Sequence, residues 1–382
     1  MKTGYRAALS ACAFALGVCL AGSPGAAQEK KEQKKGGFKA KSWDEVTDAA
    51  VAYLKTSQAD DGSWSKATHP SITAVVLTGL FQSGKSTATD GMGAKGLKYL
   101  ETLVDAKEGH LAAGENIRHK FYATSVAMQA LKASGDAKYD KTLAAAATYM
   151  KKGQVGADDG KKQDDVNYGG FGYGPNSRGD LSNTHFALDA LVAAGTPKDD
   201  PVFKRTVVFV SRMQNFKNEA QDQPWAAKTD DGSFIYVGTQ PGATTAADAP
   251  KPGYGSMTYA GIKSFILCGV GKDDPRVKKG LEWVAKNYSV DINPGRTEGA
   301  GGQGYYYYLV SMARCFDALG VDEITDANGK KHDWRADINR ALANRQRKDG
   351  SWGNDFGTWM EGDPNLDTAY ALIALSYTKP KK

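Results

Sequence analysis

The sequence has few cysteines, only four in 382 residues, so covalent cross-links contribute little to its organisation. Cys12 and Cys19 lie in an N-terminal apolar segment, which leaves Cys268 and Cys315 in the rest of the chain. Both stand in apolar segments that we expect to be buried helices. We therefore interpret them as small core residues rather than as the two halves of a disulfide.

Long hydrophobic runs are also scarce, and the one present stands at the N-terminus. Lys2 and Arg6 precede an apolar run over residues 7–21, and small residues follow at 25–27. This order predicts a secretory signal cleaved after Ala27, because the run is too short to span a bilayer as a helix. No other segment is a candidate transmembrane helix. We expect an exported protein, periplasmic or secreted, without an integral membrane segment after cleavage.

The body of the chain lacks an excess of either charge. Residues 28–41 contain six lysines and two glutamates, and the signal adds two cations. The formal net charge of +6 therefore lies in the first 41 residues, and residues 42–382 are close to neutral. We interpret residues 28–41 as a disordered Lys-rich leader. A near-neutral body gives no electrostatic footprint for nucleic acid, and we expect no nucleic-acid partner.

An internal repeat is the strongest feature that the sequence does contain. Residues 54–64 read LKTSQADDGSW, and residues 342–352 read LANRQRKDGSW. In both, an apolar residue is followed by Gln, then by Gly, then by Trp, at the same spacings. Four further segments keep the apolar end and place Gln or a substitute four residues later. Repeats at this spacing predict an array of similar structural units.

A second repeated segment follows each of these. Four copies begin with Thr and reach Gly eleven residues later; the first runs from Thr73 to Gly84. Leu309 to Gly320 keeps the spacing without the Thr, and Thr368 opens the last copy. Thr and Gly are typical of the beginning and the end of a helix. The residues between them are almost all small or apolar, which predicts helices buried on every side.

The segments that carry the Gln residues have apolar positions three and four residues apart, which predicts amphipathic helices with one buried face and one solvent-exposed face. Six such helices alternating with six fully buried ones predict an all-α fold. The buried set would line the inside of a closed ring, and the amphipathic set would surround it. Strand signals are scarce, and a hairpin near Phe234–Val237 is the best of them.

The Gln, Gly-x-Trp and Thr repeats resemble those of the prenyltransferase/squalene-cyclase superfamily. The resemblance covers residues 42–377 and implies an α/α toroid of six helix pairs. It also implies that each Gln bonds to exposed backbone at a helix end, with the Trp stacked over it. The repeats are specific for the architecture and much less so for chemistry, because one fold hosts many activities.

The catalytic motifs of that superfamily are absent. Squalene-hopene-type cyclases use the middle Asp of D-x-D-D-T as a protonated acid. The segment Pro364–Thr368 keeps only Asp367 beside the Thr, with Leu366 in the place of the acid. The segment Asp180–Thr184 keeps the first Asp and has Ser182 in that place. Neither copy is a standard cyclase motif.

Other activities of the same fold also lack their residues. The zinc ligands of protein prenyltransferases would correspond to Gln303, Tyr305 and Asp367, none of them the expected type. The Cys-Gly-Glu-Gln sequence of thioester domains does not occur. We predict no metal and no cofactor. Toroidal polysaccharide lyases need acidic ligands and a base, which Asp180, Asp363 and Asp367 with Arg118 or Lys120 could supply.

We expect the cavity to open where the inner helices begin, so polar residues there are candidates for the site. Asp367 and Asp180 are the candidate catalytic acids. The candidate ligand-binding residues are His69, Arg118, His119, Asn183, His185, Tyr305, Tyr306 and Asp363.

Each candidate has a structural alternative. Asp367 and Asn183 could be helix caps, and His69 could be a loop residue. His185 could be a satisfied core histidine beside Asp189. Of the four consecutive tyrosines from Tyr305, at least one must face the cavity, while others could form a packed aromatic seam.

We therefore expect a monomeric, exported protein whose central cavity binds an apolar isoprenoid-like molecule or a glycan. The alternatives are a divergent enzyme, of the terpene-cyclase or polysaccharide-lyase kind, and a scaffold for protein contacts. A buried apolar cavity with one desolvated carboxyl would favour a cyclase, and a wide polar groove would favour a glycan enzyme. A cavity filled by its own side chains would favour a scaffold. The long insertion over residues 216–256 is either a lid or disordered.

Overall fold

The computed structural model describes residues 41–114, 119–175, 177–238 and 251–380. These are mostly helical, and a single two-stranded hairpin is found among them. The predicted signal at residues 1–27 and all but the last residue of the predicted leader lie outside the described residues. None of the described helices combines the length and the hydropathy that crossing a membrane requires.

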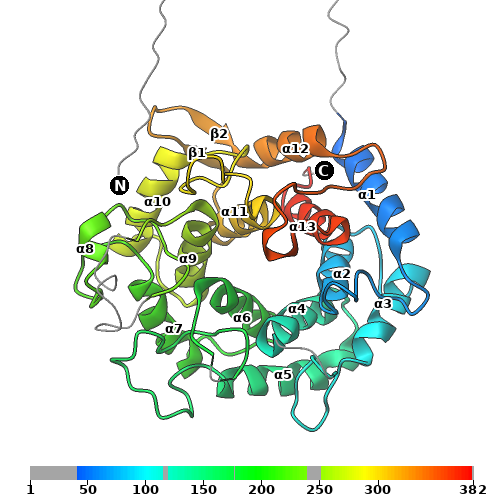
Figure 1. Cartoon of the computed structure of the whole chain (residues 1–382), viewed down its shortest axis with the longest axis horizontal. Coiled ribbons are helices and arrows are strands. Elements are labelled where there is room, and N and C mark those ends of the chain that lie inside the picture. Colours follow the sequence, from blue (N-terminus) through cyan, green and yellow to red (C-terminus); the bar gives the residue numbers. More distant parts are fainter. Residues whose placement is uncertain (1–40, 115–118, 176, 239–250, 381–382) are drawn as a thin grey trace, which may run out of the picture. The chain divides into compact units, whose positions relative to one another are not determined.

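Six helices form an inner ring. They are α2 (Ile72–Gln82), α4 (Lys120–Ala133), α6 (Leu181–Ala193), α9 (Gly255–Leu267), α11 (Tyr305–Leu319) and α13 (Pro364–Ser376). Each packs against the next along the chain, and α13 packs against α2, so the ring is closed (Figure 1). In α2 every residue from Ile72 to Phe81 is buried, as the small and apolar composition predicts.

Six amphipathic helices surround this ring. They are α1 (Trp43–Ser57), α3 (Gly91–Glu101), α5 (Asp140–Lys152), α7 (Pro201–Arg212), α10 (Pro275–Asn287) and α12 (Trp334–Arg345). Each buries one stripe; in α5 the stripe consists of Leu143, Ala146, Ala147 and Met150. Figure 1 shows the outer helices alternating with the inner ones around the ring. The prediction of an all-α toroid is confirmed.

The remaining elements are small. They are η1 (Ala137–Tyr139), α8 (Ala226–Thr229), β1 (Glu323–Thr325), β2 (Lys331–Asp333) and η2 (Thr358–Met360). β1 and β2 pair antiparallel, with Ile324 opposite His332. The hairpin predicted near Phe234–Val237 is wrong. Phe234 makes only an isolated bridge with Gln214, and its N–H donates to the Thr258 hydroxyl rather than to a partner strand.

The repeated Thr residues connect the inner helices to the preceding turns. Thr368 is not at the boundary of α13 but lies within its first turns, and its Oγ1 accepts a hydrogen bond from the backbone N of Trp352 at 3.1 Å. Thr73 does the same for Trp64 at 2.9 Å. The Thr hydroxyl therefore binds a backbone N–H of the preceding turn and does not cap its own helix. This corrects the expectation that the Thr marks the beginning of the helix.

The repeated Gln and Trp residues bind helix ends, as the resemblance implies. Gln346 Nε2 donates to the backbone O of Gly350 at 3.0 Å and to that of Val46, in α1, at 2.8 Å. The indole N–H of Trp352 donates to the Leu342 carbonyl, in the last turn of α12, at 2.9 Å. The Leu342 carbonyl also accepts a hydrogen bond from the backbone N of Gln346 at 3.1 Å, so the indole adds a second donor at this helix end. Because Val46 is in the first repeat, Gln346 also helps to close the ring.

The repeated turn glycines pack directly on backbone. Gly350 has a φ of +90°, and a Cβ placed there would lie 2.2 Å from the carbonyl oxygen of Ala49 in α1. Gly62 makes the same approach to Lys95 in α3, also at 2.2 Å. Only Gly combines this backbone conformation with this contact. The sequence element Gln…Gly-x-Trp is therefore a joint between consecutive outer helices.

The two cysteines of the body are free. Cys315 is buried in α11, and Cys268 is partly buried at the end of α9. Burial raises the pKa of each thiol to about 12, so both are held as thiols at neutral pH.

Candidate functional site

A cavity of about 230 Å³ lies where the inner helices begin. Its lining is His119, Tyr122, Tyr173, Ser182, Phe186, Tyr236, Tyr254, Ser256, Met257, Arg296, Gly304, Tyr307, Trp359, Met360, Glu361 and Tyr370. Aromatic side chains dominate this wall, and they come from the first turns of α4, α6, α11 and α13 and from the loops before and between the helices. Two ionisable side chains of opposite sign, Arg296 and Glu361, stand among them.

Glu361 is the carboxyl group of the cavity wall, and its side chain is almost fully buried. Its Oε1 accepts a hydrogen bond from the backbone N of Tyr307 at 2.8 Å, at the open N-terminus of α11. Its Oε2 accepts from Asn354 Nδ2 at 2.7 Å. Burial, which opposes the charged form, raises the pKa of Glu361 to about 7. The group can therefore hold or release a proton near neutral pH.

Asp367 lies close to Glu361 but does not line the cavity. It is the fourth residue of α13 and fully buried. Its Oδ2 accepts a hydrogen bond from the backbone N of Asn354 at 2.8 Å, and its buried Oδ1 has no partner. Burial, and then the neighbouring Glu361 carboxyl, raise the pKa of Asp367 to about 9. The two carboxyls therefore hold at least one proton between them at neutral pH.

The capping alternative for Asp367 and Asn183 is wrong. Asp363 caps α13, since its Oδ1 accepts from the backbone N of Asn365 at 2.9 Å. Asp180 caps α6, and its Oδ1 accepts from the backbone N of Asn183 at 2.8 Å. Asp180 is buried beneath the wall, and burial raises its pKa to about 6. These N-caps stand one turn earlier than the residues beside the Thr.

Two predicted ligand-binding residues, Asp363 and Asn183, lie elsewhere. Asp363 accepts hydrogen bonds from Ser65 Oγ at 2.9 Å and Thr68 Oγ1 at 3.1 Å, and so connects the last repeat to the first. Asn183 is buried against Asp180, with its Nδ2 donating to Asp180 Oδ2 at 2.7 Å. Arg118 lies outside the described residues.

The histidines divide between the wall and the core. His119 lines the cavity, and its ring is stacked on that of His69 with centroids 5.6 Å apart. Burial and then His119 lower the pKa of His69 to about 4, so it is neutral at physiological pH. His185 is fully buried, and neither of its ring nitrogens has a hydrogen-bond partner among the described residues. The structure therefore places His185 in the core, but not as the satisfied histidine that the alternative expected.

Asp189, expected beside His185, is held by cations instead. Its two oxygens lie 2.7 and 2.6 Å from Lys263 Nζ, and Oδ2 lies 2.7 Å from Arg314 NH1. Burial alone would raise the pKa of Asp189, but these two cations hold it at about 2. The three charges form a buried ion cluster at the far end of the inner helices.

One tyrosine of the four faces the cavity, and it is Tyr307. Tyr305 donates its hydroxyl to the Val290 carbonyl at 2.6 Å, and Tyr308 donates to Ser289 at 2.6 Å. Tyr306 packs its ring against Tyr305. Consecutive helical side chains point about 100° apart, so only one of the four can point inward. Tyr305 and Tyr306 belong to the aromatic seam rather than to the cavity.

With this geometry in hand, the chain can be compared with known proteins. The profile of the squalene-hopene cyclase C-terminal domain matches residues 124–378, more than half of the sequence. The chain belongs to this family. No curated protein sequence matches it.

Solved structures share the toroid of this family member. The GH76A alpha-1,6-mannanase from Salegentibacter sp. HEL1_6 is similar with a TM-score of 0.57 and 12% identity, over 88% of this chain and 99% of that one. A variant of the type II terpene cyclase MstE from Scytonema gives 0.52 and 15%, over 88% and 96%. A possible GH105 member from Salmonella enterica gives 0.51 and 11%, over 88% and 94%. At these identities the likeness shows the fold alone.

Sequence reasoning missed most of the wall of this cyclase-family chain, including Glu361, Arg296 and Trp359. Glu361 stands three residues before α13, Trp359 lies in η2, and Arg296 lies in the loop before α11, so none is beside a repeated Thr, the position that we considered. Trp359 and Met360 have φ of +54° and +68°, a left-handed backbone that costs non-glycine residues roughly 1–2 kcal/mol each. The available sequence signal was two charged residues in loops, Arg296 and Glu361, and Trp359 close to the last repeat.

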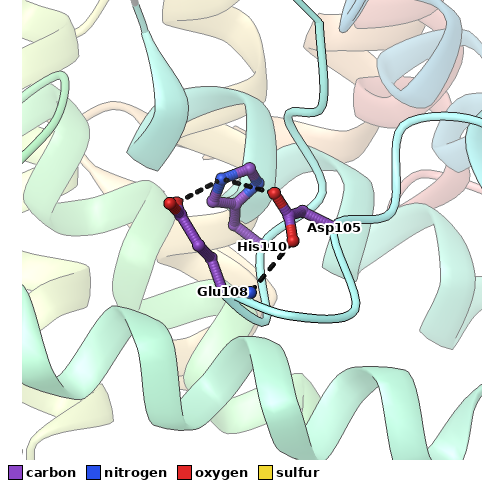
Figure 2. Close-up of side chains that lie close together, drawn as sticks. All are labelled: Asp105, Glu108 and His110. Carbon is purple, nitrogen blue, oxygen red and sulfur yellow. Dashed lines mark hydrogen bonds and ion pairs between the residues drawn. The ribbon is translucent and has the colours of Figure 1, made fainter.

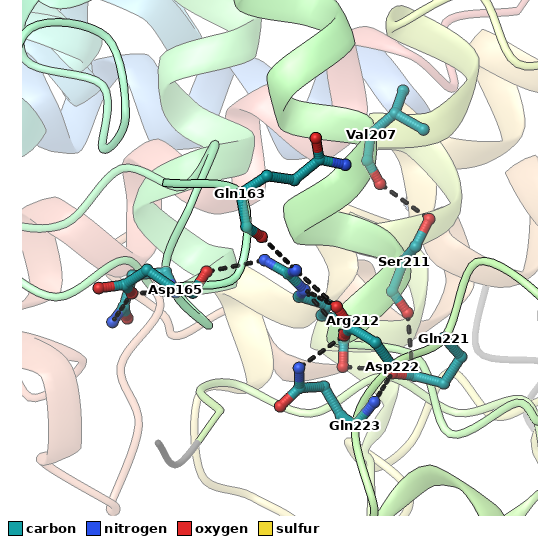
Figure 3. Close-up of polar contacts among 9 residues, drawn as sticks. Gln163, Asp165, Val207, Ser211, Arg212, Gln221, Asp222 and Gln223 are labelled. Carbon is teal, nitrogen blue, oxygen red and sulfur yellow. Dashed lines mark hydrogen bonds and ion pairs between the residues drawn. The ribbon is translucent and has the colours of Figure 1, made fainter. Parts of the chain in front are cut away.

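Two loops that precede the wall residues Tyr173 and Tyr236 in the chain are held together by Arg212 (Figure 3). This side chain is buried at the end of α7, and its Nε donates to Asp222 Oδ1 at 2.9 Å. It also donates to the backbone oxygens of Asp165, at 2.7 Å, and of Gln163. The segments that lead to Tyr173 and Tyr236 are thereby tied to one helix end. The described parts of the 216–256 insertion are ordered around the fully buried Trp225.

A second cluster of potential ligands lies in the turn before α4 (Figure 2). Asp105, Glu108 and His110 have ligand atoms within 4.8 Å of one another. His110 Nε2 lies 2.9 Å from Glu108 Oε2, and Lys120 Nζ lies 3.0 Å from the same nitrogen. The ammonium of Lys120 therefore occupies the position from which a metal ion would bind His110. This arrangement does not fit a metal site.

Proposed function

We propose that this member of the squalene-hopene cyclase family binds an apolar, isoprenoid-like ligand in its central cavity. The observation that carries the proposal is the wall: eight of its sixteen residues are Tyr, Phe or Trp. Aromatic faces suit hydrocarbon chains and rings, and the few polar groups leave little to recognise a glycan. An apolar cavity with a desolvated carboxyl is closer to the buried apolar cavity that we expected for a cyclase than to the filled cavity that we expected for a scaffold.

The size of the cavity limits the ligand. A cavity of about 150 Å³ holds one benzene molecule, so about 230 Å³ holds roughly ten non-hydrogen atoms. A ten-carbon isoprenoid, or one end of a longer chain, matches this volume. A thirty-carbon chain could not be enclosed whole.

We further propose that the protein acts after export, on the basis of the signal predicted in residues 1–27. N-terminal sequencing of the protein secreted by its host tests this. A mature chain that begins at Gln28 is the expected result, and a chain that retains its first residues would contradict it.

Binding is tested by mass spectrometry of organic extracts of the purified protein and by calorimetric titration with geraniol, a ten-carbon isoprenoid alcohol. Ser182→Trp places an indole in the cavity and should abolish geraniol binding. Ala144→Trp, on the exposed face of α5, is the matched control and should bind like the wild type. If the wild type neither yields an extractable apolar molecule nor binds geraniol, or if Ser182→Trp binds unchanged, the proposed function is wrong.

A second candidate function is acid catalysis at the same cavity, and the Glu361–Asp367 pair favours it. A carboxyl with a pKa near 7 in an aromatic enclosure can transfer a proton to an alkene or epoxide, and the aromatic faces stabilise the resulting cation. The acid would be Glu361, on the wall, rather than Asp367 or Asp180.

Incubation with an epoxidised ten-carbon isoprenoid, followed by gas chromatography, tests this function. A cyclised product of unchanged mass is expected from the wild type. Glu361→Gln should bind the compound with similar affinity and form no product. Equal product formation by the wild type and by Glu361→Gln would exclude Glu361 as the acid.

A further inference from the structure

Arg296 is held between two aromatic rings at the cavity. Its guanidinium carbon lies 3.6 Å from the ring centroid of Tyr254 and 4.8 Å from that of Trp359. Tyr254 is the residue immediately before α9, and Trp359 is in the strained turn before α13. Two elements distant in the sequence thus fix one cation in position at the wall.

This stacking leaves one hydrogen-bond donor of Arg296 without a partner. Its N–H bonds lie in the plane of the guanidinium, whereas the rings cover the faces of that plane. The Nε atom is buried and has no hydrogen-bond partner among the described residues. The cation–π contacts fix the position of the charge without satisfying this donor.

Arg296 is partly buried, and it lacks the carboxylate partner that each fully buried cation of the described chain has. Arg314 and Lys263 share Asp189, and Arg212 is paired with Asp222. No carboxylate within the described residues forms an ion pair with Arg296. Glu361, the carboxyl on the same wall, directs its oxygens to Tyr307 and Asn354 instead. Charges withdrawn from water are usually paired, so the partly buried Arg296 offers a position for an anion.

We propose that the ligand carries a carboxylate, which Arg296 binds at the mouth of the cavity while the apolar body occupies the aromatic interior. The exposed edge of the site agrees with this orientation, since Trp359 is 49% exposed and places the head group near solvent. A guanidinium offers two parallel N–H donors that match a carboxylate. The inference rests on the proposed function, because it specifies the ligand of the same cavity.

The test compares three ten-carbon probes on the full-length protein: geranic acid, geraniol and geranylamine, as acid, alcohol and cation. A charge-assisted hydrogen bond supports a preference of roughly ten- to a hundredfold. The wild type should bind geranic acid more tightly than geraniol by this factor, and geranylamine most weakly. Arg296→Met should remove the preference, so that geranic acid binds about as weakly as geraniol does to the same variant.

Two further variants make the result specific. Lys204→Met removes the same charge from the exposed face of α7 and should keep the full preference. Arg296→Lys keeps the charge and should retain part of it. Equal binding of acid and alcohol by the wild type, or an unchanged preference in Arg296→Met, would overturn the inference while leaving the proposed function in place. If none of the three probes binds, the proposed function fails, and the inference fails with it.

Discussion

Replacing Trp352 by Ala measures how much one joint of the toroid contributes to stability. The side chain is fully buried, and its indole N–H donates to the Leu342 carbonyl at 2.9 Å. A buried Trp covers on the order of 200 Å², which at about 25 cal/mol per Å² is about 5 kcal/mol as an upper estimate. Measured Trp truncations in protein cores are about 3–5 kcal/mol. We expect Trp352→Ala to lower the free energy of unfolding by this amount.

Trp352→Phe separates packing from hydrogen bonding. The Leu342 carbonyl also accepts a hydrogen bond from the backbone N of Gln346 at 3.1 Å, so it is not left without a partner. Loss of the indole donor should therefore cost about 1 kcal/mol, and the smaller ring should add about as much again. Trp64→Ala should match Trp352→Ala, because Trp64 donates to Leu54 in the same way, at 2.8 Å.

Urea denaturation followed by circular dichroism, together with thermal melting, provides the assay. A loss of 3–5 kcal/mol corresponds to a fall in Tm of about 4–7 °C for a domain of this size. Trp359→Ala, at a half-exposed Trp, should change stability by less than about 1 kcal/mol. If Trp352→Ala melts at the wild-type temperature, the repeated Trp does not hold neighbouring helices together, and the role assigned to the joint is wrong.

Three further predictions follow from the same contacts. Gly350→Ala should lower the free energy of unfolding strongly, as measured by urea denaturation, because the new Cβ would meet the Ala49 carbonyl. Gly329→Ala, with open space around it, should cost only about 1 kcal/mol of backbone strain. Equal effects of the two substitutions would refute the contact. Burial raises the pKa of Asp367 above its value in the unfolded chain, so the folded chain binds more protons than the unfolded chain between these two pKa values. The Tm should therefore fall as the pH rises from 5 to 9. Asp367→Asn should flatten this fall, and an unchanged dependence of Tm on pH would contradict the raised pKa. Arg212→Met removes the donor that holds the loop at residues 156–167, so proteolysis within this loop should be faster than in the wild type. Mass spectrometry of the fragments detects the cleavage. Cleavage at the wild-type rate would show that the loop does not depend on Arg212.

Much of the fold could be predicted from the sequence because the repeat is a local pattern with a local cause. Gln346, Gly350 and Trp352 stand at fixed spacings, and the same spacings recur at Gln58, where Nε2 donates to the Gly62 carbonyl at 3.0 Å. A residue that binds the backbone of its own turn must keep its distance from that turn in the sequence. The number of helix pairs and their alternation follow from counting such units.

The candidate site could be predicted only in its position, at the beginning of the inner helices. Of the candidates named from the sequence, His119 lines the cavity, while Asp180 and Asp367 are buried behind its wall. Their elevated pKa values depend on how completely other segments cover them, which no local pattern encodes.

What the sequence by itself determined is the architecture: helices, their order, and the joints that connect them. Only the tertiary structure decided which side chains meet at the cavity. Glu361 and Arg296 are 65 residues apart and lie in loops of irregular conformation. The burial of Glu361 and the lack of an ion pair between the two arise from the direction in which those loops fold over the ring. Helical periodicity fixes which face of a helix is apolar, but the path of a loop is set by contacts with distant segments, and these exist only once the ring has closed.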